Sequence, residues 1–269
     1  MKEIKFTTIA KACKTVGVSY LGGVNLSAKI VKNVKVGVMT YSLNLSPAET
    51  SGYNVCSHST AECRSGCLAT SGHAKMDIIS GKTIISSARI KKTKLFFENE
   101  KFFFDWLIAE LLKYQKQAIK KGMFFSARLN TISDIDWANV RPLENSNIFE
   151  LFSTVQFYDY TKNPNKFNGK PANYHLTFSF TGRNWNACEA LLKRGENIAM
   201  VFNVKKVEDL PKTYKGYTVI NGDETDFRPN DAKGVIVGLK WKRIADKVAE
   251  AKVRQSMFVV QPDNADCGY

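Results

Sequence analysis

Short apolar runs rich in β-branched and aromatic residues recur along the chain. Such runs predict strands, and several are almost continuously apolar, as is typical of strands that are buried on both faces of a sheet. We expect eight strands, at residues 35–41, 123–129, 154–160, 174–180, 197–204, 217–220, 234–241 and 257–261.

Segments with apolar residues at helical spacing separate these runs. The longest covers residues 79–121 and ends before Gly122, and two shorter ones cover residues 184–194, closed by Gly195, and 244–254. Glycine often ends a helix because it readily adopts the left-handed conformation. Strands that alternate with helices predict an α/β fold with a mostly parallel sheet. A full or partial, distorted TIM-like barrel is the first choice, and an open sheet is the second.

The chain has 269 residues and contains no internal repeat, low-complexity tract or linker. We therefore expect a single α/β domain over residues 1–269, with residues 1–34 as an N-terminal extension packed on the barrel. No apolar run is long enough to span a bilayer, and the N-terminus is too polar for a signal peptide. These features favour a cytoplasmic protein.

The net charge is +14, with lysines concentrated at residues 91–94 and 113–121. A basic surface attracts phosphate-rich partners because binding releases their counterions. The sequence thus predicts a nucleotide or a nucleic acid as partner, while a merely solvated basic face explains the charge equally well. Charge alone does not distinguish DNA, RNA and nucleotide.

Three cysteines lie close together in the segment NVCSHSTAECRSGCLATSGH, with the spacing C-x6-C-x3-C at Cys56, Cys63 and Cys67. Three thiols in a Ser- and Gly-rich loop can hold three irons of a [4Fe-4S] cluster and leave the fourth open for chemistry. Arg64 adds a positive charge that favours thiolates. The trio is therefore the predicted metal site, while the alternative is a set of unligated thiols.

Zinc is the competing metal, because His58 or His73 could complete a Cys3His site. Zinc ligands usually come in closely spaced pairs, and only the gap between Cys63 and Cys67 fits that rule. The spacing with three soft thiolates favours a cluster. Cys267 is a weaker candidate for a fourth ligand.

Polar residues follow several of the predicted strands, where the active sites of α/β barrels gather. We predict catalytic roles for Arg128, Asn130, Tyr158 and Lys162, and cofactor binding by Arg128, Asn130, Ser179 and Asp223. Arg128 would grip a carboxylate or phosphate, although an internal ion pair is an equal alternative. For Asp223, a polar turn with a supporting carboxylate is favoured over a cation site.

The cysteine segment, the A-R-x-x-K-T element (Ala88, Arg89, Lys92, Thr93), ARLNTISDIDW, QFYDYTKN and NGDETDFRP together resemble the phage "gene product 88" family over most of the chain. This resemblance implies a bacteriophage origin, and hence the host cytoplasm, but no reaction.

The three-cysteine loop after the first strand is more loosely similar to the radical S-adenosylmethionine enzymes, whose common spacing is C-x3-C-x2-C. That resemblance implies S-adenosylmethionine at an open iron, together with an electron donor.

Two functions from different classes follow. The first is an iron–sulfur enzyme, similar to the radical S-adenosylmethionine enzymes, that acts on a phosphate-bearing substrate such as a nucleotide or nucleic acid. The second is a non-enzymatic nucleic-acid-binding or host-takeover protein with a structural zinc or cluster. The oligomeric state cannot be read from the sequence.

Overall fold

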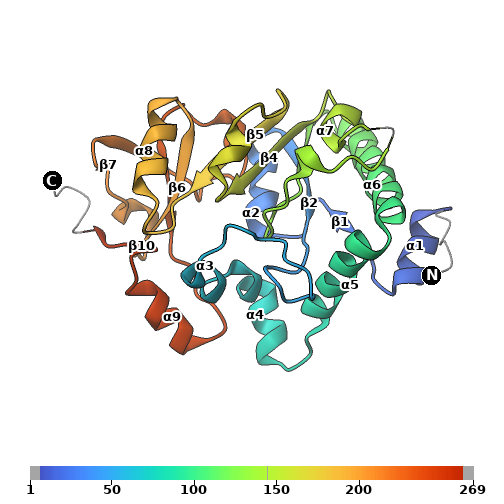
Figure 1. Ribbon diagram of the computed structural model, residues 1–269, viewed down its shortest axis with the longest axis horizontal. Helices are drawn as coiled ribbons and strands as arrows, with labels where there is room; N and C mark the ends of the chain where they lie inside the picture. Colours follow the sequence, from blue (N-terminus) through green and yellow to red (C-terminus); the bar gives the residue numbers. More distant parts are fainter. Residues whose placement is uncertain (1–6, 144, 263–269) are drawn as a thin grey trace. The chain divides into compact units, whose positions relative to one another are not determined.

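The computed structural model describes residues 7–143 and 145–262 (Figure 1). They form two compact units that are built from interleaved segments of the chain. Among the described residues, the first unit comprises residues 7–57, 83–143, 145–159 and 169–175, and the second comprises residues 58–82, 160–168 and 176–262. Cys267 lies outside the described residues, as do residues 1–6 of the predicted N-terminal extension.

The first unit contains a four-strand segment of sheet in the order β1-β2-β3-β4. Strands β2, β3 and β4 are parallel, and β1 pairs antiparallel with β2. Strand β4 begins in this unit, and its last two residues belong to the second. The elements are α1 (Ile9–Val16), β1 (Gly22–Gly23), α2 (Ala28–Val31), β2 (Val38–Leu43), α5 (Ile84–Glu98), α6 (Glu100–Lys120), β3 (Phe124–Arg128), α7 (Ile148–Leu151) and β4 (Gln156–Thr161).

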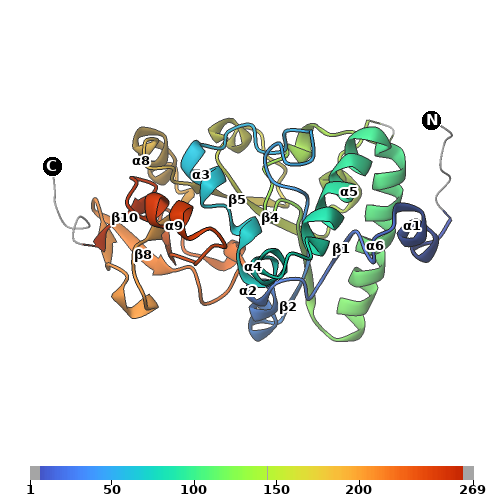
Figure 2. The same ribbon diagram turned by 90° about the horizontal axis from the view of Figure 1, so that it is seen from below.

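Helix α6 covers this part of the sheet and packs against β1, β2 and β3, with α5 alongside it (Figures 1 and 2). Its apolar side forms an aromatic core with Phe96 of α5 and with Trp137. The ring of Phe96 lies 5.1 Å from that of Phe103 and 5.2 Å from that of Trp137. Helix α1, from the predicted extension, contacts both α5 and α6.

The second unit contains strands in the order β5-β6-β9-β8-β7, with β10 beside β6, and the first two residues of β5 belong to the first unit. All pairs are parallel except β7 with β8. The elements are α3 (Ala61–Ser65), α4 (Gly72–Ile79), β5 (Tyr174–Ser179), α8 (Trp185–Lys193), β6 (Asn197–Phe202), β7 (Thr213–Tyr214), β8 (Tyr217–Asn221), β9 (Ile236–Lys240), α9 (Lys247–Arg254) and β10 (Val259–Val260).

All eight predicted strands are present, with bounds shifted by a few residues, and the α/β class with a mostly parallel sheet is confirmed. The additional strands β1 and β7 have two residues each, too few to show an alternating pattern. Among the described residues, the strand order within each unit has two ends and does not close on itself.

The long predicted helix is wrong in one respect, because the chain forms two helices there instead of one. Thr83 adopts a left-handed conformation with φ of 51° just before α5. Asn99, with φ of −147°, ends α5, and its side chain caps α6 by accepting a hydrogen bond from the N–H of Phe102 at 3.2 Å. The predicted stops are confirmed, because Gly122 and Gly195 adopt φ of 62° and 81°.

No helix in the described ranges is both long and apolar enough to cross a membrane.

Candidate functional site

Cys63 and Cys67 lie in a short helical stretch of the second unit, where an irregular loop was predicted. Cys63 lies in α3, whose N-cap Thr60 accepts a hydrogen bond from the Cys63 N–H at 3.2 Å. Cys67 caps the following 3₁₀ turn, and its Sγ accepts a hydrogen bond from the N–H of Ala69 at 3.5 Å. Both thiols are half-buried, and neither is in a disulfide.

Cys56 is held by a folded loop of the first unit. The N–H of Ala48 donates to Cys56 Sγ at 3.4 Å, while the carbonyl of Ala48 accepts from the N–H of Val55 at 3.0 Å. Ala48 adopts a positive φ of 48°, a conformation that alanine rarely takes. Cys56 is also half-buried and outside any disulfide.

The cysteine trio is thus divided between the two units. Within residues 7–143 and 145–262 there is no group of three or more His, Cys, Asp or Glu side chains placed to hold a metal ion. His58 and His73, the alternative zinc ligands, are both exposed. The binding of a metal by the trio remains a prediction.

Asn130 organises the loop that follows β3. Its Oδ1 accepts hydrogen bonds from Ser133 Oγ and the Ile135 N–H, both at 2.9 Å, and from Trp137 Nε1 at 3.2 Å. The loop also reaches the cysteine segment of the same unit, because the N–H of Asp134 donates to the carbonyl of Val55 at 2.7 Å. The structure therefore brings the loop of one predicted site residue next to Cys56.

Arg128 lies at the end of β3 beside a buried carboxylate. Its Nε is 3.9 Å from Oδ1 of Asp159, which also accepts the N–H of Asn130 at 2.8 Å. The hydroxyl of Tyr174 donates to the other oxygen of Asp159 at 3.0 Å. Burial raises the pKa of Tyr174 well above its ordinary value, and the charge of Asp159 adds to this effect. This geometry is an internal ion pair, and a substrate clamp at Arg128 stays a prediction.

The remaining predicted site residues fall into different places. Tyr158 of the first unit is fully buried, and its hydroxyl accepts a hydrogen bond from Asn33 Nδ2 at 2.9 Å. In the second unit, Asp223 pairs with Lys242 at 3.2 Å and accepts the backbone N–H of Lys240 at 3.0 Å. Lys162 and Ser179 of the same unit are half-buried. The structure thus gives Tyr158 and Asp223 structural contacts, and it leaves the predicted roles of all four residues untested.

A second polar network in the first unit was not predicted. It centres on Glu110 of α6, which is only 2% exposed. One carboxylate oxygen accepts the Leu21 N–H at 3.0 Å and Trp106 Nε1 at 2.9 Å. The other accepts the Gly22 N–H at 2.8 Å and the Tyr41 hydroxyl at 2.7 Å. Glu110 therefore ties the N-terminal segment to α6 and β2.

Lys92 is a second buried charge near this network. It is only 4% exposed, and its ammonium lies 4.3 Å from the ring centre of Tyr20. Burial lowers the pKa of Lys92 to about 8, against the opposing effect of Glu110. For the nearby thiol of Cys13, burial raises the pKa and Glu110 adds to the rise, whereas Lys113 and Lys92 lower it. A glutamate on the apolar face of a predicted helix was the signal that could have revealed this cluster.

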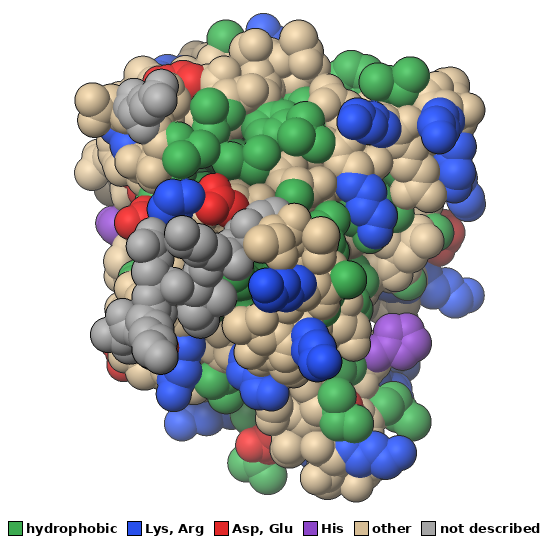
Figure 3. All heavy atoms as spheres, turned by 90° about the vertical axis from the view of Figure 1, so that its right-hand side faces the viewer, with side chains coloured by type: hydrophobic (Ala, Val, Ile, Leu, Met, Phe, Trp, Pro, Cys, Tyr) green, Lys and Arg blue, Asp and Glu red, His purple; other side chains and the backbone are tan. Residues whose placement is uncertain are grey.

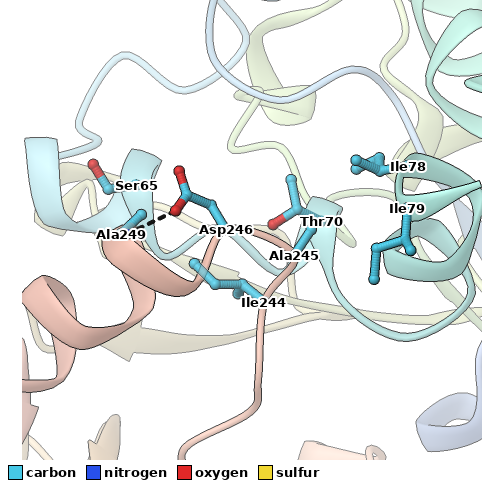
Figure 4. Close-up of a pocket in the computed structure, with 8 residues that line it drawn as sticks. All are labelled: Ser65, Thr70, Ile78, Ile79, Ile244, Ala245, Asp246 and Ala249. Carbon is cyan, nitrogen blue, oxygen red and sulfur yellow. Dashed lines mark hydrogen bonds between the residues drawn. The ribbon is translucent and has the colours of Figure 1, made fainter. Parts of the chain in front are cut away.

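A cavity of about 520 Å³ lies in the second unit beside the segment that carries Cys63 and Cys67 (Figure 4). Its walls are mainly aliphatic, and the hydroxyl of Thr70 on its rim donates to the carbonyl of Cys67 at 3.0 Å. The Ala245 N–H donates to the Thr70 carbonyl at 3.1 Å and joins the two sides of the cavity. Cavities of this size bind small ligands. It is lined by Ser65, Thr70, Ile78, Ile79, Ile244, Ala245, Asp246 and Ala249.

Comparisons with known proteins give one match. A family model described as "Gene product 88" matches residues 10–257, which cover most of the chain. Searches of curated proteins and of solved structures found no match. The family supports the predicted bacteriophage origin, whereas the likeness to radical S-adenosylmethionine enzymes gains no support. The chain belongs to the gene product 88 family.

Proposed function

We propose that Cys56, Cys63 and Cys67 hold an iron–sulfur cluster and that the protein acts on a phosphate-bearing substrate, a nucleotide or a nucleic acid. The observation that carries this proposal is the presence of three half-buried cysteines, none of them in a disulfide, within twelve consecutive residues. The other described cysteines, the half-buried Cys13 and the buried Cys188, are instead scattered along the sequence.

The local chemistry of the donors fits a metal–thiolate centre. Cys56 and Cys67 each accept a backbone N–H on sulfur, from Ala48 and Ala69. Hydrogen bonds of this kind stabilise the thiolate that ligates a metal, and in iron–sulfur proteins they tune the cluster. The half-buried positions leave the sulfurs accessible for ligation.

When bound, a cluster with an open iron supplies a binding position for a substrate or S-adenosylmethionine and a route for one electron. The chain's own contribution is to position and shield the reactants. The cavity beside Cys63 and Cys67 has the size for a small substrate, and the net charge of +14 favours phosphate. Arg128, Asn130, Tyr158, Lys162, Ser179 and Asp223 remain the candidates for orienting such a molecule.

Purification without oxygen, followed by iron and sulfide analysis, tests the cluster. We expect broad visible absorbance and iron in the wild-type protein, and the loss of both in Cys63→Ala. Cys13→Ser is the matched control, because Cys13 is a free, half-buried thiol outside the trio. Colourless protein without iron, after cluster reconstitution, would contradict the proposal. Formation of 5′-deoxyadenosine from S-adenosylmethionine and a reductant would add the enzymatic step.

The second candidate is a nucleic-acid-binding protein in which the same cysteines hold a structural zinc. The exposed lysines in the second half of α6 favour it. Stoichiometric zinc in a colourless protein, lost in Cys63→Ala but retained in Cys13→Ser, would establish this alternative. The first candidate, the iron–sulfur enzyme, includes a barrel fold with the cysteines at its rim. The second candidate does not require a barrel.

A further inference from the structure

Three lysines form a basic stripe along the outer face of α6. Lys113, Lys116 and Lys120 are all exposed, and they follow the spacing of three and four residues that places side chains on one helical face. With a rise of about 1.5 Å per residue, the stripe extends roughly 10 Å along the helix. This length covers more than one phosphate spacing of a nucleic-acid strand.

Neighbouring helices extend the stripe into a wider basic surface, here called the lysine face. Helix α1, which contacts α5 and α6, carries the exposed Lys11 and Lys14. Lys91 of α5 is also exposed, and its ammonium donates to the carbonyl of Gly17 at the end of α1 at 3.1 Å. Figure 3 shows the side of the molecule on which these helices lie, where Lys and Arg side chains outnumber acidic ones.

Among the described residues, the acidic side chains of α6 do not neutralise the basic stripe. Glu110 is the one carboxylate in the second half of α6, and it is buried with four hydrogen bonds to its oxygens. Asp105 lies farther toward the helix start and pairs with Lys101 at 2.8 Å. Within the described part of the chain, Lys116 and Lys120 make no ion pair, so their charges face solvent.

We propose that the lysine face binds the phosphate backbone of duplex nucleic acid without reading its sequence. This inference rests on the proposed function, since it names the phosphate-bearing partner. Lysine contacts phosphates as a point charge, whereas the bidentate contacts that identify bases come mostly from Arg, Asn and Gln.

Two other partners, a single-stranded nucleic acid and a membrane surface, fit the lysine face less well. Single strands are held by exposed aromatic rings on which bases stack, whereas Tyr114, the aromatic residue beside the stripe, is half-buried and its ring centre lies 5.1 Å from the ammonium of Lys113. A membrane surface needs a broad apolar face on the same helix. Here the broad apolar face of α6 is buried in the core, and Leu112 and Ile119 are the large apolar residues exposed beside the stripe.

Fluorescence anisotropy with a labelled 20-base-pair DNA duplex of arbitrary sequence, over a series of salt concentrations, tests the inference. We compare the wild type with a variant in which Lys113, Lys116 and Lys120 are changed to Gln. Each phosphate contact contributes about 0.9 to the slope of log K against log salt, so the slope should fall by about 3 and the affinity roughly tenfold or more. The matched control changes Lys205, Lys212 and Lys233, exposed lysines of the second unit, and removes the same charge.

Equal weakening by both triple variants would overturn the inference, because it would show an effect of net charge alone. Preferential binding of a single strand or of anionic phospholipid vesicles would overturn it as well. The same titration with Cys63→Ala separates the two proposals. Duplex binding that survives in this variant, in a protein that never contains iron, would support the lysine face while refuting the cluster.

Discussion

The buried carboxylate of Glu110 gives the sharpest prediction for the stability of the first unit. It accepts two backbone N–H groups, of Leu21 and Gly22, and two side-chain donors, Tyr41 and Trp106. All four donors point at a side chain that is 2% exposed, so water cannot replace a lost acceptor. The substitution Glu110→Gln keeps the shape but replaces one oxygen with an NH₂ group, which only donates.

The loss of stability in Glu110→Gln follows from the arrangement of the donors, because each carboxylate oxygen of Glu110 accepts two hydrogen bonds. Whichever way the amide turns, its nitrogen faces two donors, and at least one of these is a backbone N–H that cannot rotate away. If the NH₂ faces Gly22 and Tyr41, the hydroxyl can turn to accept, but the Gly22 N–H stays unpaired. A hydrogen bond to a charged group contributes about 1.5–3 kcal/mol, and a buried unpaired donor costs about 1–3 kcal/mol. We therefore expect the free energy of unfolding to fall by about 3–4 kcal/mol.

Urea denaturation followed by tryptophan fluorescence measures this change, since Trp106 contacts Glu110 directly. Glu98→Gln is the control. Glu98 is exposed and accepts one hydrogen bond, from the Tyr53 hydroxyl at 3.2 Å, so its change should stay within about 0.5 kcal/mol. A loss below about 1 kcal/mol in Glu110→Gln would refute the view that this carboxylate organises the N-terminal segment.

Three further outcomes are expected. Gly22→Ala should destabilise the protein by about 2–3 kcal/mol in the same urea assay, because a Cβ there would lie 2.3 Å from the Tyr41 ring; Gly23→Ala, where the nearest atom is 3.5 Å away, should be much milder. Burial lowers the pKa of Lys92 from 10.5 to about 8, so the unfolded chain binds more protons between these values. The stability of the wild type relative to Lys92→Met should therefore rise by about 3 kcal/mol from pH 8 to pH 10.5, and a flat difference would contradict the burial of the amine. Burial raises the pKa of Cys188 to about 12, so mass spectrometry after iodoacetamide treatment of the native, metal-free protein should find Cys63 alkylated and Cys188 unmodified.

Eight of the ten strands in the described residues were predictable from the sequence, because each of these is a short apolar run with a local signal. The break at Asn99 also has a local signal, since asparagine is a preferred N-cap and here accepts the Phe102 N–H. The apolar spacing on both sides of Asn99 was nevertheless interpreted as one helix. Periodicity alone cannot show where the helix axis changes direction, which is why this boundary was missed.

The Glu110 network was not predictable in the same way. Leu21 and Gly22 reach the carboxylate from 89 and 88 residues away in the sequence, and no spacing connects them. The cysteine trio is the opposite case, because its spacing is evident in the sequence but its members belong to different units. The environment of Arg128 was also not predictable, because its ion-pair partner Asp159 lies on the next strand of the sheet and no local spacing connects the two residues.

The A-R-x-x-K-T element in α5 shows how a motif can support a site without belonging to it. Thr93 is fully buried, and its Oγ1 accepts the N–H of Ser46 at 2.7 Å while donating to the carbonyl of Arg89 at 2.9 Å. Ser46 begins the loop in which Ala48 donates its N–H to the sulfur of Cys56. A rigid helix thus fixes the start of the loop, and the loop's own hydrogen bonds fix the thiol. In the proposed metal site a ligating sulfur has to be held in place before the metal binds, so this contact gives Thr93 a role in positioning Cys56.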